Sequence, residues 1–164
     1  MTHRHAATWS TAEIPDLTGT HAVVTGPTVG GIGFHTALEL AKHGAHVTLA
    51  GRTQGKLDQA AAGIAAAHPP ARTSTLILDL ASFDSVRAAA SRLAEGGPLN
   101  LLINNAGVMA TPRRRTADGL ELQIGTNHYG PFVLTGMLPG LAEPGSRPGR
   151  IFAHEVAVPG SGSP

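Results

Sequence analysis

The amino-acid sequence predicts an α/β fold: a doubly wound parallel sheet of about five strands with helices on both faces. Two observations carry this prediction. Short apolar runs of strand length alternate along the chain with segments whose apolar residues follow the helical period. The connections between successive strands are long enough to hold a helix, which favours right-handed crossovers and parallel strands.

Five runs are predicted to be strands: residues 21–25, 46–50, 73–78, 99–103 and 150–153. Three helices are predicted between them, at residues 34–43, 54–67 and 83–95. Gly44 follows the first helix in the position that tolerates a positive φ, and Ser82 is a suitable N-cap for the third. A long apolar segment, residues 120–142, supplies a fourth helix that Pro131 and Pro139 are expected to interrupt.

The 164 residues suffice for one domain with its own hydrophobic core. We assign this domain to residues 17–153. It lies between a polar N-terminal segment, residues 1–16, and a tail rich in Pro, Gly and Ser, residues 154–164, which we expect to be disordered.

Composition excludes several classes of function. The 12 basic and 11 acidic residues leave a formal charge of +1, and only two of the basic residues are Lys, so we expect no nucleic-acid partner. The chain has no Cys, which excludes disulfides, thiolate zinc sites and a cysteine nucleophile. No apolar run approaches the ~18 residues of a membrane span, so we expect none. Residues 1–10 lack the apolar stretch of a secretory signal, which makes the cytoplasm the expected compartment. We expect no metal at the pairs His3/His5 and His43/His46, because the first lies in the N-terminal segment and the second joins a helix end to a strand start.

A glycine-rich segment, TGPTVGGIG, joins the first predicted strand to the first helix. In that context a turn without side chains lets a pyrophosphate approach the N–H groups at the helix N-terminus, where the dipole carries about +0.5 charge. A tight turn that binds nothing is the alternative, and the strand before and helix after favour binding. The predicted binding residues in this segment are Gly26, Gly30, Gly31, Ile32 and Gly33.

The end of the second strand predicts which dinucleotide is preferred. Proteins that prefer NAD carry an acid about 20 residues after the glycines, and this chain has no carboxylate between Glu39 and Asp58. Arg52 stands there instead, 52 − 33 = 19 residues after Gly33. A guanidinium in this place would bind a 2′-phosphate, so NADP is favoured over NAD. Lys56 can assist, although a solvated helix residue is the simpler interpretation.

Several segments together resemble the short-chain dehydrogenase/reductase family, with a particular similarity to its retinol-dehydrogenase-like and protochlorophyllide-reductase-like members. They are VVTGPTVGGIG, LAGR, LDLASFDSVR, LLINNAGVMATP and TADGLELQIGTNHYGPFVLTGMLP. The resemblance implies a Rossmann-type fold and hydride transfer between NADP(H) and a small carbonyl or alcohol. It also implies that Asp79 and Leu80 line the adenine pocket, and that Asn127 matches the family's catalytic-site Asn. On the ribose side it implies Asn104, Asn105, Ala106 and Gly107.

The chain departs from the family pattern in two ways. The family spaces its glycines as T-G-x-x-x-G-x-G, whereas Gly33 is one residue later here, so either Gly30 or Gly31 takes the middle position. The family's chemistry also uses a Ser and a Tyr-x-x-x-Lys pair. The only Tyr is Tyr129, four residues before Val133, and no Lys follows Lys56. We reject Tyr129 as a substitute acid because no cation near it in sequence would lower its pKa.

Three hypotheses account for this pattern. The chain belongs to an oxidoreductase lineage but is inactive as it stands and would act on a small carbonyl or alcohol only at full length. Alternatively, it is an NADP-binding module without catalysis. The third hypothesis is a truncated or frameshifted product, because the family pattern is lost after Ala153. A sheet lacking its last covering elements would expose apolar surface and an open edge, so we also predict self-association.

Overall fold

The computed structural model describes residues 9–138 and 150–153. The predicted 154–164 tail and the His3/His5 pair lie outside these residues, as does the end of the 120–142 segment. The described chain forms one five-stranded parallel sheet with the order β3-β2-β1-β4-β5. The doubly wound α/β prediction is therefore confirmed.

Every predicted strand forms, with ends shifted by at most two residues. Their bounds are β1, His21–Thr25; β2, His46–Gly51; β3, Arg72–Ile77; β4, Leu101–Asn104; and β5, Arg150–Ala153. The central strand β1 pairs Val23 with Thr48 on one side and with Leu102 on the other. Strand β5 lies at one edge of the described sheet, while self-association itself stays a prediction.

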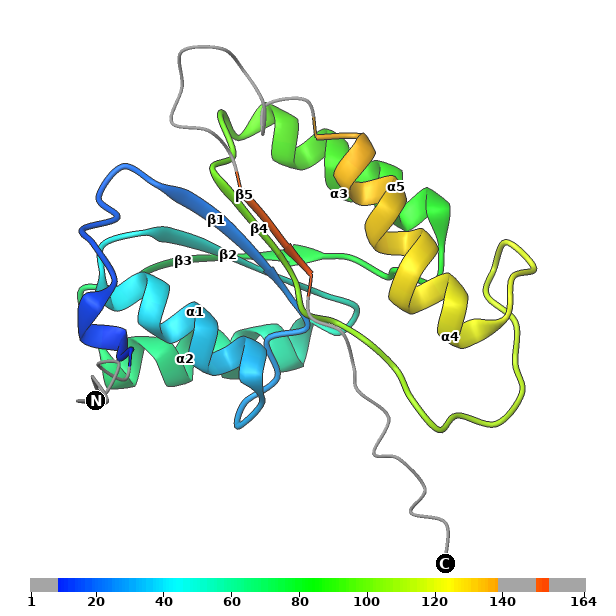
Figure 1. The fold of residues 1–164 in the computed structure, drawn as a ribbon, viewed down its shortest axis with the longest axis horizontal. Helices are drawn as coiled ribbons and strands as arrows, with labels where there is room; N and C mark the ends of the chain where they lie inside the picture. The colour runs from blue at the N-terminus through cyan, green and yellow to red at the C-terminus, as the bar shows by residue number, and fades with distance from the viewer. Residues whose placement is uncertain (1–8, 139–149, 154–164) are drawn as a thin grey trace, which may run out of the picture.

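Helices cover both faces of the sheet (Figure 1). Helices α1, Ile32–Lys42, and α2, Gln54–Ala67, pack on one face around a core that includes Val24, Leu49 and Ile64. Helix α3, Phe83–Glu95, packs on the other face around Val23, Leu102 and Leu134. Successive strand residues point to opposite faces, so a single strand such as β1 contributes to both cores.

The predicted caps form where they were expected. The hydroxyl of Ser82 accepts a hydrogen bond from the backbone N–H of Ser85 at the start of α3. Gly44 follows the end of α1 with φ +93°. At the start of the chain, a single turn of 3-10 helix, η1, Thr11–Glu13, begins after Ser10.

The segment after β4 differs from its prediction in one respect. Pro131 does not interrupt the helix. The chain runs from α4, Leu122–Ile124, through a turn of π-helix, η2, Gly125–Tyr129, into α5, Gly130–Gly136. Pro131 lies in the first turn of α5, just after the last bond of the turn of π-helix, from the N–H of Gly130 to the carbonyl of Gly125, so proline breaks neither element. None of the helices in the described ranges is long and apolar enough to cross a bilayer.

Candidate functional site

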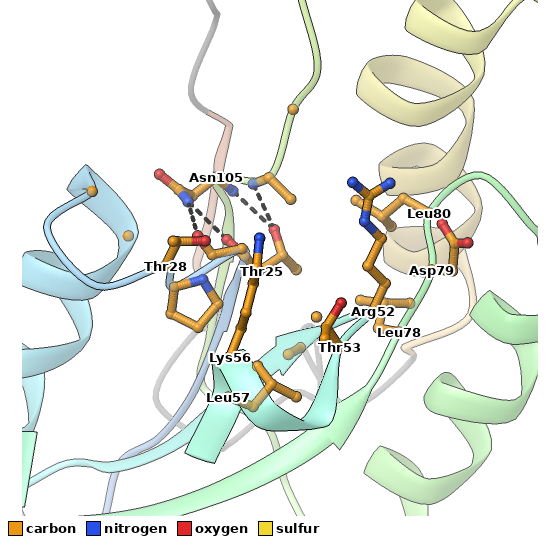
Figure 2. Close-up of a pocket in the computed structure, with 18 of the residues that line it drawn as sticks. Thr25, Thr28, Arg52, Thr53, Lys56, Leu57, Leu78, Asp79, Leu80 and Asn105 are labelled. Carbon is orange, nitrogen blue, oxygen red and sulfur yellow. Dashed lines mark hydrogen bonds between the residues drawn. The ribbon is translucent and has the colours of Figure 1, made fainter. Parts of the chain in front are cut away.

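A pocket of about 390 Å³ opens at the carboxyl ends of the strands, beside the glycine-rich turn (Figure 2). It brings together all but two of the twelve predicted cofactor-binding residues. Gly30 and Asn104 are the exceptions: neither belongs to the lining. The predicted residues that do line it are Gly26, Gly31, Ile32, Gly33, Arg52, Asp79, Leu80, Asn105, Ala106 and Gly107.

The two outer glycines of the turn are required by close packing. Gly26 has φ +67°, and a Cβ built there would lie 2.9 Å from the Cα of Ala106. A Cβ on Gly33 would lie 2.9 Å from Cγ of Asn105 and 3.0 Å from the carbonyl oxygen of Gly26. Any side chain at either position would push the turn away from the segment after β4, so these glycines hold the pocket wall together.

A hydrogen-bond network centred on Thr25 joins the same two segments. The fully buried Thr25 hydroxyl accepts from the backbone N–H groups of Asn105 and Ala106, each at 3.0 Å, and donates to the carbonyl of Ile103 at 3.3 Å. The Asn105 side-chain amide donates back to the carbonyls of Thr25, at 2.8 Å, and Gly26, at 3.2 Å. Figure 2 shows the hydrogen bonds that join Asn105 and Ala106 to Thr25 and Gly26 at the end of β1. Asn105 therefore ties β4 to the glycine-rich turn.

Gly31 occupies the junction between the turn and helix α1. It is the N-cap residue, accepts hydrogen bonds on its carbonyl from Phe34 and His35, and has no side chain to cap the helix. The N–H groups of Ile32 and Gly33, which precede those two donors in α1, are thus left available for an anion at the pocket. Gly30 has φ +79° with no neighbour within 4 Å of a built Cβ. Gly31 is the glycine that directly precedes α1, and which of the two takes the family's middle position stays a prediction.

Two positively charged side chains line the pocket: Arg52, directly after β2, and Lys56, in the first turn of α2. Figure 2 shows the side chains of Arg52 and Lys56 pointing into the same space, with Thr53 between their elements. Lys56 is exposed, as a solvated helix residue would be, and it also lines the pocket. The only carboxylate among the lining residues is that of Asp79. Its Oδ1 accepts the N–H of Ala81 at 2.9 Å, which directs the carboxylate toward its own turn.

The far wall of the pocket consists of Leu78, Leu80 and Thr126, which come from the chain after β3 and from η2. Leu78 and Leu80 are 3% and 5% exposed and belong to the core under α3, so this wall is rigid and apolar. A flat heterocycle would pack well against such a surface. The contribution of Thr126 depends on the turn of π-helix and was not predicted.

Asn127 and Asn104 do not belong to the pocket lining. The Asn127 side chain accepts the N–H of Val108 and donates to its carbonyl, both at 2.8 Å. Because Val108 lines the pocket, Asn127 holds the segment after β4 against η2. Asn104 is 8% exposed and donates to the hydroxyl of Thr135, so its side chain joins β4 to α5.

Tyr129 and the histidines of the His43/His46 pair contact nearby rings and backbone. Tyr129 is 41% exposed and contacts the ring of His128 edge to face. His43 Nδ1 lies 2.8 Å from the carbonyl oxygen of Glu39, and His46 stacks on His21 with ring centroids 4.9 Å apart. Within residues 9–138 and 150–153 no three metal-ligating side chains gather.

Sequence reasoning missed several lining residues. Thr25, Thr28, Thr53, Val108 and Thr126 line the pocket without having been predicted to do so. Thr25 and Val108 lie within the quoted motifs, next to predicted binding residues, so their position was the available signal. The sequence held no such signal for Thr126, because the orientation of its side chain depends on how η2 packs.

The comparisons with known proteins agree with this geometry. The family model described as short chain dehydrogenase matches residues 20–153. An uncharacterised oxidoreductase of Schizosaccharomyces pombe is 45% identical over 156 residues, which cover 91% of this chain and 45% of that protein. Retinol dehydrogenase 11 of Mus musculus is 49% identical over 123 residues, covering 74% of this chain and 39% of its own.

A solved structure extends the comparison to three dimensions. A metagenomic short-chain oxidoreductase in complex with NADP superposes with a TM-score of 0.65 at 32% identity, covering 77% of this chain and 57% of that one. The chain spans less than half the length of the two curated relatives named above.

Proposed function

Because the chain belongs to the short-chain dehydrogenase family, we propose that its pocket binds NADP(H) as the cofactor part of an oxidoreductase. When bound, that cofactor supplies or accepts the hydride that converts a carbonyl to an alcohol or back. The substrate that we propose for the whole protein is a small carbonyl or alcohol. The observation that carries the proposal is the convergence of Arg52 and Lys56 with the uncapped N-terminus of α1 on one pocket.

Each part of the pocket suits one part of the dinucleotide. The first-turn N–H groups of α1, at Ile32 and Gly33, would hold the pyrophosphate. The carboxyl end of β2 would hold the adenosine ribose, with its 2′-phosphate beside Arg52. Leu80 would pack on the adenine. A Cβ at Gly33 would collide with the side chain of Asn105, so glycine there lets the N-terminus of α1 lie close to the segment after β4.

Preference for NADP over NAD is proposed from charge. A guanidinium that forms a charge-assisted hydrogen bond contributes about 1.5 to 3 kcal/mol, and because Arg52 is exposed we take the lower end. That corresponds to about tenfold in affinity for ligands that carry the 2′-phosphate. NAD has no such group, so its affinity should not depend on Arg52.

The experiment compares dissociation constants of NADP+ and NAD+ by isothermal titration calorimetry. We expect Arg52→Ala to weaken NADP+ about tenfold and to leave NAD+ unchanged. Arg92→Ala is the matched control, because Arg92 is an exposed arginine on α3 that does not line the pocket. Equal affinity of the unsubstituted protein for the two dinucleotides would refute the preference.

A second candidate function is nucleotide binding without catalysis by this chain alone. It is favoured because the Tyr-x-x-x-Lys pair that the family uses for proton transfer has no counterpart at the pocket. The sequence holds no Lys after Lys56, and its one Tyr contacts a histidine ring and does not line the pocket. An NADPH absorbance assay with a panel of aldehydes and ketones separates the two functions. Turnover above background by the purified chain would rule out this candidate.

A further inference from the structure

We propose that Gly130 positions Leu80 and thereby sets the shape of the adenine side of the pocket. The inference rests on the proposed function, because it concerns the same pocket. It also gives the turn of π-helix a role in shaping the pocket, which no sequence motif predicted.

Helix α5 lies with its backbone directly on the backbone of residue 80. The N–H of Gly130 donates to the carbonyl of Gly125 and closes the turn of π-helix. A Cβ built on Gly130 would lie 2.9 Å from Cβ of Leu80 and 3.1 Å from its carbonyl carbon, with the carbonyl oxygen nearer still. These neighbours are backbone atoms or the first atom of a side chain, so no rotamer change relieves the contact.

The segment that carries Leu80 is held from its other sides. The N–H of Asp79 donates to the hydroxyl of Ser85 at 2.9 Å, which ties the segment to the first turn of α3. On the other side of Leu80, the carbonyl of Ala81 accepts a hydrogen bond from the backbone N–H of Ala117 at 3.0 Å. A side chain at residue 130 must therefore either push Leu80 toward the pocket or lift α5 away from the sheet.

Both displacements change the pocket. Leu80 lines it directly, and Thr126 lines it from η2, four residues before Gly130. Thr126 is 8% exposed, so the helix meets the pocket with a packed surface. Gly125, at the other end of η2, is confined in the same way, because a Cβ there would collide with the side chain of Thr116. The turn of π-helix is thus held between two close contacts that require glycine, that of Gly125 with Thr116 and that of Gly130 with Leu80.

The test compares Gly130→Ala with Gly136→Ala, a substitution in the same helix where a built Cβ has no neighbour within 4 Å. Adenosine 2′,5′-bisphosphate, NADP+, NAD+ and nicotinamide mononucleotide are titrated by calorimetry. We expect Gly130→Ala to weaken every adenine-containing ligand about tenfold, which is the size of effect expected from forcing one carbon into a packed contact. The ratio of NADP+ to NAD+ affinity and the affinity for nicotinamide mononucleotide stay as in the unsubstituted protein, and Gly136→Ala binds normally.

The outcomes separate this inference from the proposed function. If the unsubstituted protein binds no adenine nucleotide, the proposed function and this inference both fail. If it binds them and Gly130→Ala binds equally well, only the inference fails. A changed NADP+ to NAD+ ratio in Gly130→Ala would also overturn it, because that ratio is assigned to Arg52.

A measurement on the unsubstituted protein covers the case in which Gly130→Ala does not fold. Titration of adenosine 2′,5′-bisphosphate is followed by the ¹⁵N–¹H resonances of the glycine amides. The Gly130 resonance is expected to shift with the same dissociation constant as that of Gly33, while the Gly136 resonance stays in place. A Gly130 resonance that does not move while Gly33 saturates would overturn the inference.

Discussion

The hydroxyl of Thr25 allows the sharpest test of how the pocket is held together. Replacing Thr25 by Val keeps nearly the same shape and removes the acceptor of two backbone N–H groups, those of Asn105 and Ala106. Because Thr25 itself is fully buried, water cannot take the place of the hydroxyl without opening the structure. The substitution isolates the hydrogen bonds from packing, which a change to Ala would not do.

The magnitude follows from the number of donors left without a partner. A buried donor that loses its acceptor costs about 1 to 3 kcal/mol, and we use about 1 to 2 for each here because Asn105 and Ala106 are half-buried. The two together lower the free energy of unfolding by about 2 to 4 kcal/mol. For a domain of this size that corresponds to a fall in Tm of roughly 10 °C.

Urea denaturation followed by circular dichroism measures the loss. Thr25→Ser is the control, since it keeps the hydroxyl and removes one methyl group, at a cost of about 1 kcal/mol. We expect Thr25→Val to lose clearly more than Thr25→Ser and also to bind NADP+ more weakly. If Thr25→Val is as stable as Thr25→Ser, the hydroxyl does not hold the segment after β4 and the reasoning is wrong.

Two further predictions concern other parts of the fold. Burial, with the neighbouring His46, lowers the pKa of His21 from its usual value of 6.5, so the folded state favours the neutral ring. The unfolded chain binds the proton more readily, and stability is therefore complete above about pH 6.5 and decreases as the pH falls from there toward the lowered pKa of the folded state. Urea melts between pH 8 and pH 5 measure this slope, which should be smaller in His21→Asn; an unchanged slope would contradict the assignment. Gly26 and Gly30 both have a positive φ, so alanine strains the backbone at either position, but only a Cβ at Gly26 also collides with Ala106. Gly26→Ala should therefore weaken NADP+ binding much more than Gly30→Ala; equal losses in the same titration would show that the contact has no importance.

Much of the fold could be predicted because its signals are local. The apolar run at residues 21–25, the glycines after it and the cap at Ser82 each act within a few residues, and all formed as expected. The segment at residues 120–142 was the main difference. Pro131 was expected to interrupt the helix. It lies instead directly after the turn of π-helix, in the first turn of α5, where proline is tolerated.

The candidate site divides in the same way. The glycine pattern and Arg52 predicted a binding pocket, and the fold brings most of the predicted residues to one place. Lys56 was interpreted as a solvated helix residue, which its exposure supports, yet one turn of α2 also points it into the pocket (Figure 2). Asn104 belongs to the predicted motif, yet its side chain donates to the hydroxyl of Thr135 and does not line the pocket.

The sequence by itself determined the alternation of strands and helices, the position of the glycine-rich turn and the sign of the charge at the end of β2. These depend on periodicity, turn chemistry and residue type, which act over short distances along the chain. Only the tertiary structure decided that Thr25 would bond to residues some 80 positions away, and that Gly130 would lie against Leu80. Contacts of this kind depend on how complete elements pack together, and no local pattern encodes that packing.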